Sequence, residues 1–247
     1  MKLRILSYNI HKGFTIGSTD FILERMRHAM REVNADILFL QEVLGDHNDK
    51  KCIIPEWQTA IQFEYLADSV WPHFAYGKNA IYAEGHHGNA ILSKFPIIEW
   101  SNQHISTNRF EQRGLLKAKI KIPQTDKEIV IANTHLDLTQ GGRNQQAKFI
   151  IQDMKKTDEL PWVLVGDFND WNKKISKKLE SELNAVEAFK QIYGNYPLTF
   201  PSFMPLLSLD RVFLHKANAI NAIALRDGHW RKLSDHIPLY VEIEIED

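Results

Sequence analysis

The sequence predicts an α/β protein of the α+β type, with mixed β-sheets covered by helices. Short apolar runs rich in β-branched residues recur along the whole chain, which is typical of strands. Between them lie segments whose apolar residues recur at helical spacing. Two parallel-looking βα units open the chain, and several strands with short connections follow. This order favours mixed sheets under helices, in one compact domain over residues 1–247.

Eight apolar runs are predicted to be strands. In chain order they read LRILSYNI, ADILFLQEV, NAILS, LLKAKIKI, EIVIANTHL, PWVLVGD, LDRVFLH and PLYVEIEI. In the fourth run Lys117, Lys119 and Lys121 alternate with apolar residues and face one way, as on a half-exposed strand. Other runs are continuously apolar, as expected for strands that are covered on both faces.

Four segments are predicted to be helices. The apolar stripe of the first helix consists of Ile22, Met26, Met30 and Val33. Thr19 or Asp20 is its predicted N-cap. The second reads GGRNQQAKFIIQDMKK, and its apolar stripe consists of Ala147, Ile150, Ile151 and Met154. A third is predicted over residues 55–70, and a fourth follows Trp171.

The composition is that of an ordinary globular protein, with 44% hydrophobic and 25% charged residues. The single cysteine, Cys52, excludes an intramolecular disulfide and a zinc site of several cysteines. A formal charge of −1 lacks the basic excess of proteins that hold long duplex DNA nonspecifically, although charge can be local. The densest basic run, KKISKK, is interpreted as the solvated face of a helix.

The N-terminal apolar run is broken at Ser7 and Asn9, which makes it too short and too polar for the core of a signal peptide. No stretch approaches the ~20 apolar residues of a membrane span. We therefore expect a cytoplasmic protein without an integral membrane segment, and we expect a monomer.

Polar side chains gather where the apolar runs end. They are Asn9, His11, Glu42, His135, Asp137, Asp167, Asn169, Asp210, Asp235 and His236. Each has an ordinary interpretation when taken alone: His135 could be a buried histidine, and Asp210 a buried carboxylate paired with Arg211. Their coincidence favours a site, because strand ends in layered α/β folds face a common crevice.

The residue types indicate a hydrolase of phosphoesters. Oxygen ligands suit a hard cation such as Mg²⁺ or Mn²⁺. The candidates are Glu42, Asp167, Asn169 and Asp235, with Asn9 beside them. Neutral histidines indicate proton transfer or stabilisation of an anionic transition state, and His236 has an orienting partner in Asp210. Because no Gly-rich phosphate loop is present, this set indicates hydrolysis by water and argues against a kinase.

Asn9 and five motifs, LQEV, NTHLD, VGDFND, LDRVF and LSDHIPL, resemble in that order the signature of the endonuclease/exonuclease/phosphatase superfamily. This superfamily includes DNase I, abasic endonucleases, inositol polyphosphate 5-phosphatases and bacterial sphingomyelinases. The resemblance runs from about Leu3 to Ile243. It implies a DNase I-like four-layer α/β/β/α sandwich, in which two mixed sheets pack face to face with helices outside.

The resemblance also implies the binding groups. Glu42 is the main Mg²⁺ ligand, Asn9 lies beside it, and Asp235 supports the metal and water side. The segment FEQRGLL places Arg113 near the substrate, with a fold-holding salt bridge as the alternative. The segment GHHGNAILS places Asn89 there in the same way.

The reacting groups follow by the same resemblance. Asp167 positions or deprotonates the attacking water, while Asn169 holds the phosphoryl oxygens. His236, oriented by Asp210, contacts the phosphate, and either it or Asp167 is the base. His135 stabilises the pentavalent intermediate or protonates the leaving oxygen.

His135 stands where abasic endonucleases carry a tyrosine-containing motif, so the chain looks closer to the DNase I, sphingomyelinase and phosphatase branches. NIHKG, EGHHGNAILS and GDFNDW together resemble small bacterial members known as cardiolipin-synthase-associated. That label describes gene context and does not identify a lipid substrate.

Three functions fit these residues. The first is hydrolysis of a phosphodiester in a nucleic acid or a phospholipid headgroup. The second is hydrolysis of a phosphomonoester in an inositol phosphate or small metabolite, which would need more cations than the nearby Lys12, Lys78, Arg113 and Arg143. The third is a binding protein that has lost catalysis, although all the motifs retain their chemical groups. Specificity would lie in loops such as 196–209, whose apolar residues could touch an acyl chain, stack a base or simply pack.

Overall fold

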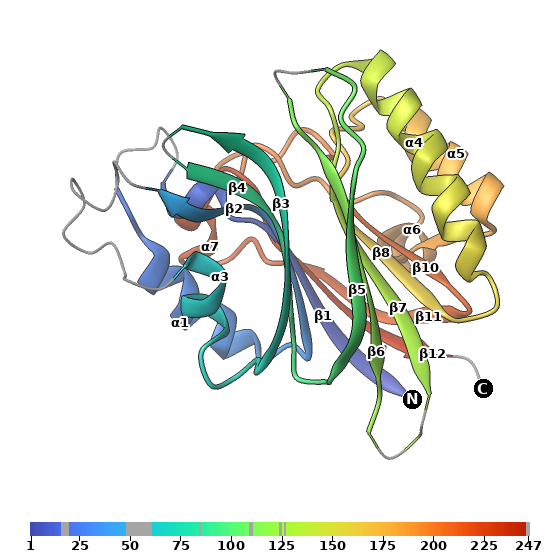
Figure 1. Cartoon of the computed structure of the whole chain (residues 1–247), viewed down its shortest axis with the longest axis horizontal. Coiled ribbons are helices and arrows are strands. Elements are labelled where there is room, and N and C mark those ends of the chain that lie inside the picture. Colours follow the sequence, from blue (N-terminus) through green and yellow to red (C-terminus); the bar gives the residue numbers. More distant parts are fainter. Residues whose placement is uncertain are drawn as a thin grey trace.

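Two six-stranded sheets form the centre of the molecule (Figure 1). The structure is a computed structural model that describes residues 1–15, 20–47, 61–83, 85–108, 111–123, 125 and 127–245. The first sheet consists of β1 (Lys2–Asn9), β2 (Ile37–His47), β3 (His73–Tyr82), β4 (Gly85–Ser93), β11 (Ala217–Ala224) and β12 (Leu239–Ile245). The second consists of β5 (Ile97–His104), β6 (Gly114–Lys121), β7 (Glu128–His135), β8 (Trp162–Asp167), β9 (Val186–Glu187) and β10 (Asp210–His215).

Helices cover the outer face of each sheet (Figure 1). The first sheet is covered by α1 (Leu23–Val33), α3 (Gln62–Ala67) and α7 (Trp230–Leu233). The second is covered by α4 (Gln140–Met154) and α5 (Lys174–Leu183), while α6 (Ala188–Tyr193) contacts β10 and β11. Short 3₁₀ turns follow β1 and α4, as η1 (His11–Gly13) and η2 (Lys155–Thr157). The predicted four-layer sandwich is confirmed.

The largest apolar core fills the space between the sheets. Ile5, Phe39 and Ile91 enter it from the first sheet, while Ile131 and Val212 enter it from the second. Separate cores lie under the helices on each outer face. The continuously apolar strands are therefore buried on both faces, and the alternating lysines of β6 point outward, as predicted.

Each sheet carries one parallel pair at its centre. The strand orders are β11-β12-β1-β2-β4-β3 and β5-β6-β7-β8-β10-β9. The pairs β1–β2 and β7–β8 are parallel, while their neighbours are antiparallel. The carboxyl ends of the four parallel strands and the amino ends of β10 and β12 therefore meet at one end of the sandwich. All the predicted motifs of the site lie there.

A buried amide clamp joins the sheets beneath that end. The Asn133 side chain of β7 donates to the carbonyls of Leu40 and Ala90, at 2.9 Å each, across the interface. Gln41 donates to the Asn133 side-chain oxygen at 2.8 Å. Both amides are fully buried, so these bonds fix β7 against β2 and β4.

The helix boundaries depart from prediction in two places. Asp20 is not the N-cap of α1, because its backbone is hydrogen-bonded to Thr15; Ile22 holds that position, and Thr19 lies outside the described residues. Within residues 61–70 the third predicted helix is limited to α3, and residues 55–60 and Cys52 also lie outside the described part. The fourth helix begins at Lys174. None of the described helices is both long and apolar enough to cross a membrane.

Candidate active site

The Asn9 side chain joins the two halves of the candidate site. Its amide nitrogen lies 3.3 Å from Glu42 Oε1 and 3.2 Å from Asp167 Oδ2. Asn9 and Glu42 come from the first sheet and Asp167 from the second. Asn9 Oδ1 accepts the His11 backbone N–H at 3.1 Å, which fixes the orientation of the amide. One side chain therefore places the two carboxylates beside each other.

Glu42 is turned toward this end of the sandwich by an irregularity in β2. Its φ is 55°, and the pairing of β2 with β4 shifts between Leu40 and Val43. Such a bulge redirects a side chain out of the strand's alternation. Burial raises the pKa of Glu42, but Lys12, the Asn9 hydrogen bond and His11 outweigh it and hold the pKa below its ordinary value. Glu42 is therefore ionised at neutral pH.

Asp167 is the centre of the polar cluster and is almost fully buried. Its Oδ1 accepts the Asn169 backbone N–H at 2.9 Å. Its Oδ2 faces Asn9 as well as Nε2 of His135 and Nε2 of His236, each at 3.5 Å. Burial raises the pKa of Asp167 above its usual range, and Asp210 adds to this while His236 opposes it.

His236 lies between two carboxylates. Its Nδ1 is 2.9 Å from Asp210 Oδ2, and its Nε2 faces Asp167. Burial lowers the pKa of His236, but Asp210 and Asp167 outweigh it, and the pKa is raised. With a carboxylate near each ring nitrogen, the ring is an imidazolium that is hydrogen-bonded to Asp210 through Nδ1 and faces Asp167 with Nε2.

Asp210 serves His236 rather than Arg211. The Arg211 guanidinium donates to the backbone carbonyls of Asp210, Asp170 and Ser208 and to the Ser176 hydroxyl. Asp170 in turn accepts from the Ser176 backbone and hydroxyl near the start of α5. The simple pairing of Asp210 with Arg211 is therefore not found.

His135 and Asn169 form the second half of the cluster. The Asn169 amide donates to the Leu136 carbonyl at 3.0 Å, and its nitrogen lies 3.2 Å from His135 Nε2. Burial lowers the pKa of His135 well below its ordinary value, and Arg113 lowers it further. His135 is thus neutral. Arg113 Nη1 is 3.5 Å from its Nδ1, and Arg113 also pairs with Glu111 at 3.6 Å.

A polar cavity of about 210 Å³ opens beside Glu42. It is lined by Lys12, Glu42, Ala80, His87, Glu111, Gln112 and Arg113. Burial and then Lys12 lower the pKa of His87 to about 4, so this ring is neutral. Lys12 and Arg113 are the cations among the described residues that line the cavity.

Arg143 and Lys78 do not line the cavity. The buried Arg143 guanidinium donates to the carbonyls of Asp137 and Leu138 and stacks on Trp171, so it holds the start of α4. Lys78 is exposed on β3.

Asp235 and Asn89 lie around the cluster. Asp235 is half-buried, with Oδ2 3.4 Å from His11 Nδ1, and it follows Ser234, whose hydroxyl donates to the Asn9 carbonyl at 2.7 Å. Asn89 is buried and donates to the Gly114 carbonyl at 3.3 Å, so it joins β4 to β6. Ligation of metal by Asp235 and of substrate by Asn89 stay predictions.

Sequence reasoning did not assign several residues that complete this end of the sandwich. Gln41 and Asn133 clamp the sheets beneath it, Ser234 fixes the loop before β12, and His87 lines the cavity. His87 had a signal, because it belongs to the GHHGNAILS segment. Gln41 and Asn133 lie within the motif runs, but their partners come from the other sheet and leave no trace in local spacing.

The donor set fits a hard divalent cation. Glu42 is ionised, Asn9 brings its carboxylate beside that of Asp167, and Asp235 adds another oxygen ligand. Ligand atoms of Asp167, Asp210 and His236 also lie within 4.8 Å of one another. In that group His236 and Asp210 are already hydrogen-bonded to each other. This arrangement fits a proton relay better than a metal site.

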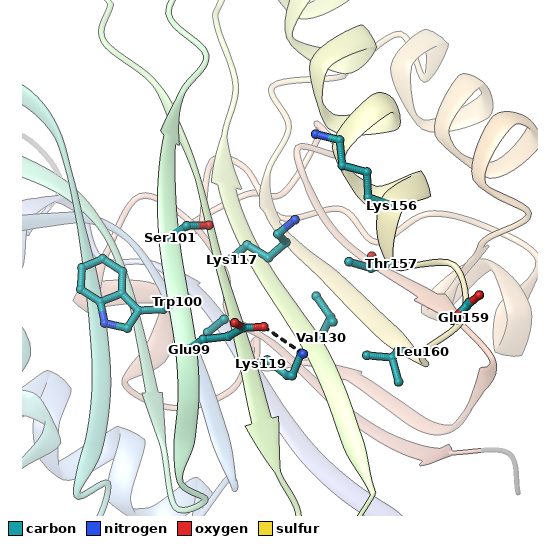
Figure 2. A pocket seen from close by; sticks show the side chains of 11 residues that line it. Glu99, Trp100, Ser101, Lys117, Lys119, Val130, Lys156, Thr157, Glu159 and Leu160 are labelled. Atoms are coloured by element: carbon teal, nitrogen blue, oxygen red, sulfur yellow. Dashed lines mark ion pairs between the residues drawn. The ribbon is translucent and has the colours of Figure 1, made fainter.

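A larger cavity lies elsewhere and holds none of these groups. It measures about 450 Å³, and Figure 2 shows it between β5, β6 and the end of α4. Its lysines are paired with acids: Lys117 with Asp153, and Lys119 with Glu99 at 2.9 Å (Figure 2). This cavity lies where the outer helical layer ends beside β5 and β6, away from the candidate site.

A sequence model described as the Endonuclease/Exonuclease/phosphatase family matches residues 6–236. The chain belongs to this family. The resemblance seen in the motifs is thus confirmed at the family level. Membership indicates a hydrolase of phosphoesters, since the family includes nucleases, phosphodiesterases and phosphatases.

This family member has a relative of similar length in Escherichia coli (strain K12), the uncharacterised protein YbhP. The two are 41% identical over 243 residues, which cover 98% of this chain and 96% of YbhP. The endonuclease/exonuclease/phosphatase from Bacteroides vulgatus is 20% identical, with a TM-score of 0.78 and complete coverage of both chains. The Bacteroides thetaiotaomicron mannosyl-6-phosphatase Bt3783 is 19% identical, with a TM-score of 0.76 over 98% of this chain and 100% of that one. These two structures show the DNase I-like fold alone.

Proposed function

We propose that this protein is a divalent-metal-dependent phosphodiesterase that hydrolyses a phosphoester with an activated water. The observation that carries the proposal is the setting of Asp167. This buried carboxylate faces both histidines and is tied to Glu42 through the Asn9 amide. Such a site can take a proton from water while a neighbouring cation faces the phosphoryl group.

Glu42 and Asp235 would hold Mg²⁺ or Mn²⁺, and the Asn9 amide beside them would fix the Glu42 carboxylate. When bound, the metal supplies positive charge that offsets the charge of the phosphoryl oxygens. The ionised state of Glu42 and the all-oxygen donor set support this assignment. Its position beside the cavity would bring the phosphoester next to Lys12 and Arg113.

Asp167 acts as the base in this proposal, and His236 as the positive charge. His236 has carboxylates at both ring nitrogens, so it has no free lone pair with which to accept a proton from water. Asp167 Oδ2 can accept that proton, and the His236 Nε2–H can donate to a phosphoryl oxygen. Asp210 holds the His236 ring and stabilises its charge.

His135 orients Asn169 in this proposal. His135 Nε2 lies 3.2 Å from the Asn169 amide nitrogen, so the ring can fix the orientation of that amide. The position supports a role beside the phosphoryl group, with the Asn169 amide fixed next to Asp167.

The few cations favour a diester over a monoester. A diester carries one negative charge at neutral pH and a monoester close to two. Of the four cations weighed from the sequence, Lys12 and Arg113 line the cavity. The second candidate is a monoesterase for a small hydrophilic phosphate, which the small and polar character of the cavity favours. A cytoplasmic location and a monomeric state are part of the proposal.

The test is a hydrolysis panel with Mg²⁺ and with Mn²⁺. It contains a bis-aryl phosphodiester, an aryl phosphomonoester, plasmid and single-stranded DNA, RNA, phospholipids, inositol phosphates and mannose 6-phosphate. We expect diester hydrolysis that a chelator abolishes and that Asp167→Asn lowers by about 10²–10⁴-fold. The exposed Asp158→Asn is the matched control.

Three outcomes would overturn the proposal. Asp167→Asn with wild-type turnover would remove the base assigned here. Faster hydrolysis of monoesters than of diesters would select the second candidate. An absence of hydrolysis of every substrate, with either metal added, would favour a binding protein.

A further inference from the structure

Residues 197–209, here called the apolar hairpin, leave large apolar side chains in the solvent. Phe200 and Leu207 pair across an antiparallel bridge, and the chain turns between them. The exposed fractions are 57% for Phe203, 54% for Met204, 61% for Leu206, and 39% for Leu198 and Leu207. The segment contains no charged residue. Ordinary packing therefore does not account for these five side chains.

The base of the hairpin is fixed beside the candidate site. The Ser202 hydroxyl donates to the Ser234 carbonyl at 2.6 Å, and its backbone N–H donates to the Asp235 carbonyl at 2.7 Å. The Phe200 ring centroid lies 5.1 Å from that of His236. The apolar tip is thus held on an ordered support, next to the imidazole of the site.

The segment that contacts the apolar hairpin carries cations. Arg226 donates to the Leu198 carbonyl at 3.2 Å, and the Arg231 carbonyl accepts from the Ser202 hydroxyl. Lys232 follows Arg231 in α7, and both are exposed. The one acid in residues 225–233 is Asp227.

A groove of about 580 Å³ continues the apolar surface from the base of the hairpin to β11. Exposed Tyr193 and Ile223 line it together with Leu198, and Lys173 and Arg226 add positive charge. The described surface here therefore combines protruding apolar groups with neighbouring cations.

We propose that the apolar hairpin docks this protein on the surface of an anionic phospholipid bilayer. Phe203, Met204 and Leu206 enter the boundary between headgroups and acyl chains, and the cations of the contacting segment meet anionic headgroups. Apolar side chains next to basic ones are the combination that binds such a surface.

The side chains favour lipid over nucleic acid. Four of the five exposed groups are aliphatic, whereas single-stranded nucleic acids stack their bases on aromatic rings. The formal charge of the whole chain is −1, without the basic excess that tracks a phosphate backbone. Docking is measured without turnover, so it can hold or fail apart from the proposed function.

The experiment is co-sedimentation with vesicles of phosphatidylcholine alone and of phosphatidylcholine mixed with phosphatidylglycerol. Wild type is expected to bind the mixed vesicles. The triple variant Phe203→Ser, Met204→Ser, Leu206→Ser is expected to lose at least about tenfold in partition coefficient. Phe149→Ser, which alters a 56% exposed phenylalanine on α4, is the matched control and should bind as wild type does.

A second pair of variants tests the charge. Lys232→Gln should weaken binding to the mixed vesicles and not to phosphatidylcholine, while the exposed Lys148→Gln on α4 should have no effect. Unchanged circular dichroism and unchanged hydrolysis of a soluble bis-aryl diester by the triple variant would show that its fold and site are intact.

Several results would overturn the docking proposal. One is that wild type does not co-sediment with the mixed vesicles, and another is that wild type and the triple variant bind them equally. The proposal would also fail if the triple variant lost binding to single-stranded DNA and not to vesicles, or if wild type were a dimer and the triple variant a monomer. Vesicle binding without any hydrolytic activity would leave docking in place and remove the proposed function.

Discussion

At the scale of single residues, backbone strain coincides with the candidate site. Glu42 has a φ of 55° and Asn169 a φ of 48°, a left-handed conformation that costs a residue with a side chain roughly 1–2 kcal/mol. Asparagine tolerates this conformation better than glutamate does. The strain at Glu42 persists because the β2 bulge and the Asn9 hydrogen bond fix the carboxylate. Strained residues of this kind concentrate at functional sites.

The first prediction concerns the Glu42 charge. Glu42→Gln keeps the shape of the side chain but removes the anionic ligand, so we expect lost Mg²⁺ binding in titration calorimetry and at least about a hundredfold lower turnover. Far-ultraviolet circular dichroism should be unchanged. Glu64→Gln, on the exposed face of α3, is the control. Mg²⁺ affinity equal to that of wild type would contradict the assignment of Glu42.

At the scale of elements, the amide clamp sets β7 against β2 and β4. Asn133→Leu would leave the carbonyls of Leu40 and Ala90 and the amide of Gln41 without this partner. Buried polar groups without partners cost about 1–3 kcal/mol each, so we expect the free energy of unfolding to fall by at least about 3 kcal/mol in urea denaturation. The exposed Asn195→Leu should change it little. Equal losses in the two variants would argue against the clamp.

A buried carboxyl group at the junction of β9 and α6 is expected to make the stability of the protein depend on pH. Glu187 is buried and accepts the N–H groups of Lys190 and Val212. Burial raises its pKa from 4.5 to about 7, although Arg211 opposes the shift. Because the folded protein holds this proton more tightly than the unfolded chain, its contribution to stability is complete below pH 4.5 and is lost as the pH rises through about 7.

Glu187→Gln removes that dependence. Both proteins are unfolded with urea from acidic to slightly alkaline pH. Over this range the free energy of unfolding of the variant should rise relative to that of wild type by on the order of 3 kcal/mol. The gain should develop between the unfolded pKa of 4.5 and a pH above about 7. Parallel curves for the two proteins would show that this carboxyl does not titrate as described.

The elements that the sequence predicted are those with strong local signals. All eight apolar runs form strands, whereas the exposed β5 and the two-residue β9 lack a continuous apolar run. The N-cap of α1 was wrong because Phe14 bridges to Phe21 and the Asp20 carbonyl accepts the Thr15 N–H, so the helix follows Ile22. The helical spacing of apolar residues does not encode this bridge.

At the scale of the whole molecule, the proposed metal binding would be linked to stability. A ligand that binds only the folded state at 100 times its Kd adds about 2.7 kcal/mol, or roughly 5–10 °C in Tm for a chain of this size. We expect Mg²⁺ or Mn²⁺ to raise the Tm in differential scanning calorimetry and a chelator to reverse the rise. Glu42→Gln should not respond. An equal rise in both proteins would indicate binding elsewhere.

The candidate site itself was predicted in outline, because the polar ends of separate strands had to meet wherever the strands shared a crevice. Asn9, Asp167, Asp210 and His236 are in contact as their motifs suggested. Arg143 does not line the cavity, because its guanidinium donates to the backbone carbonyls of Asp137 and Leu138. The exposure of the apolar hairpin was equally beyond the sequence, since an apolar loop has the same composition whether it packs or protrudes.

The two sheets share the candidate site, and this has a consequence for heat inactivation. Asn9 reaches across to Asp167, and His236 reaches across to Asp210, so both bonds span the interface between the sheets. A small slip of one sheet over the other would break the geometry while each sheet kept its own hydrogen bonds. The proposed hydrolytic activity should therefore fall on warming before the circular dichroism changes, so that loss of activity would report the alignment of the two sheets.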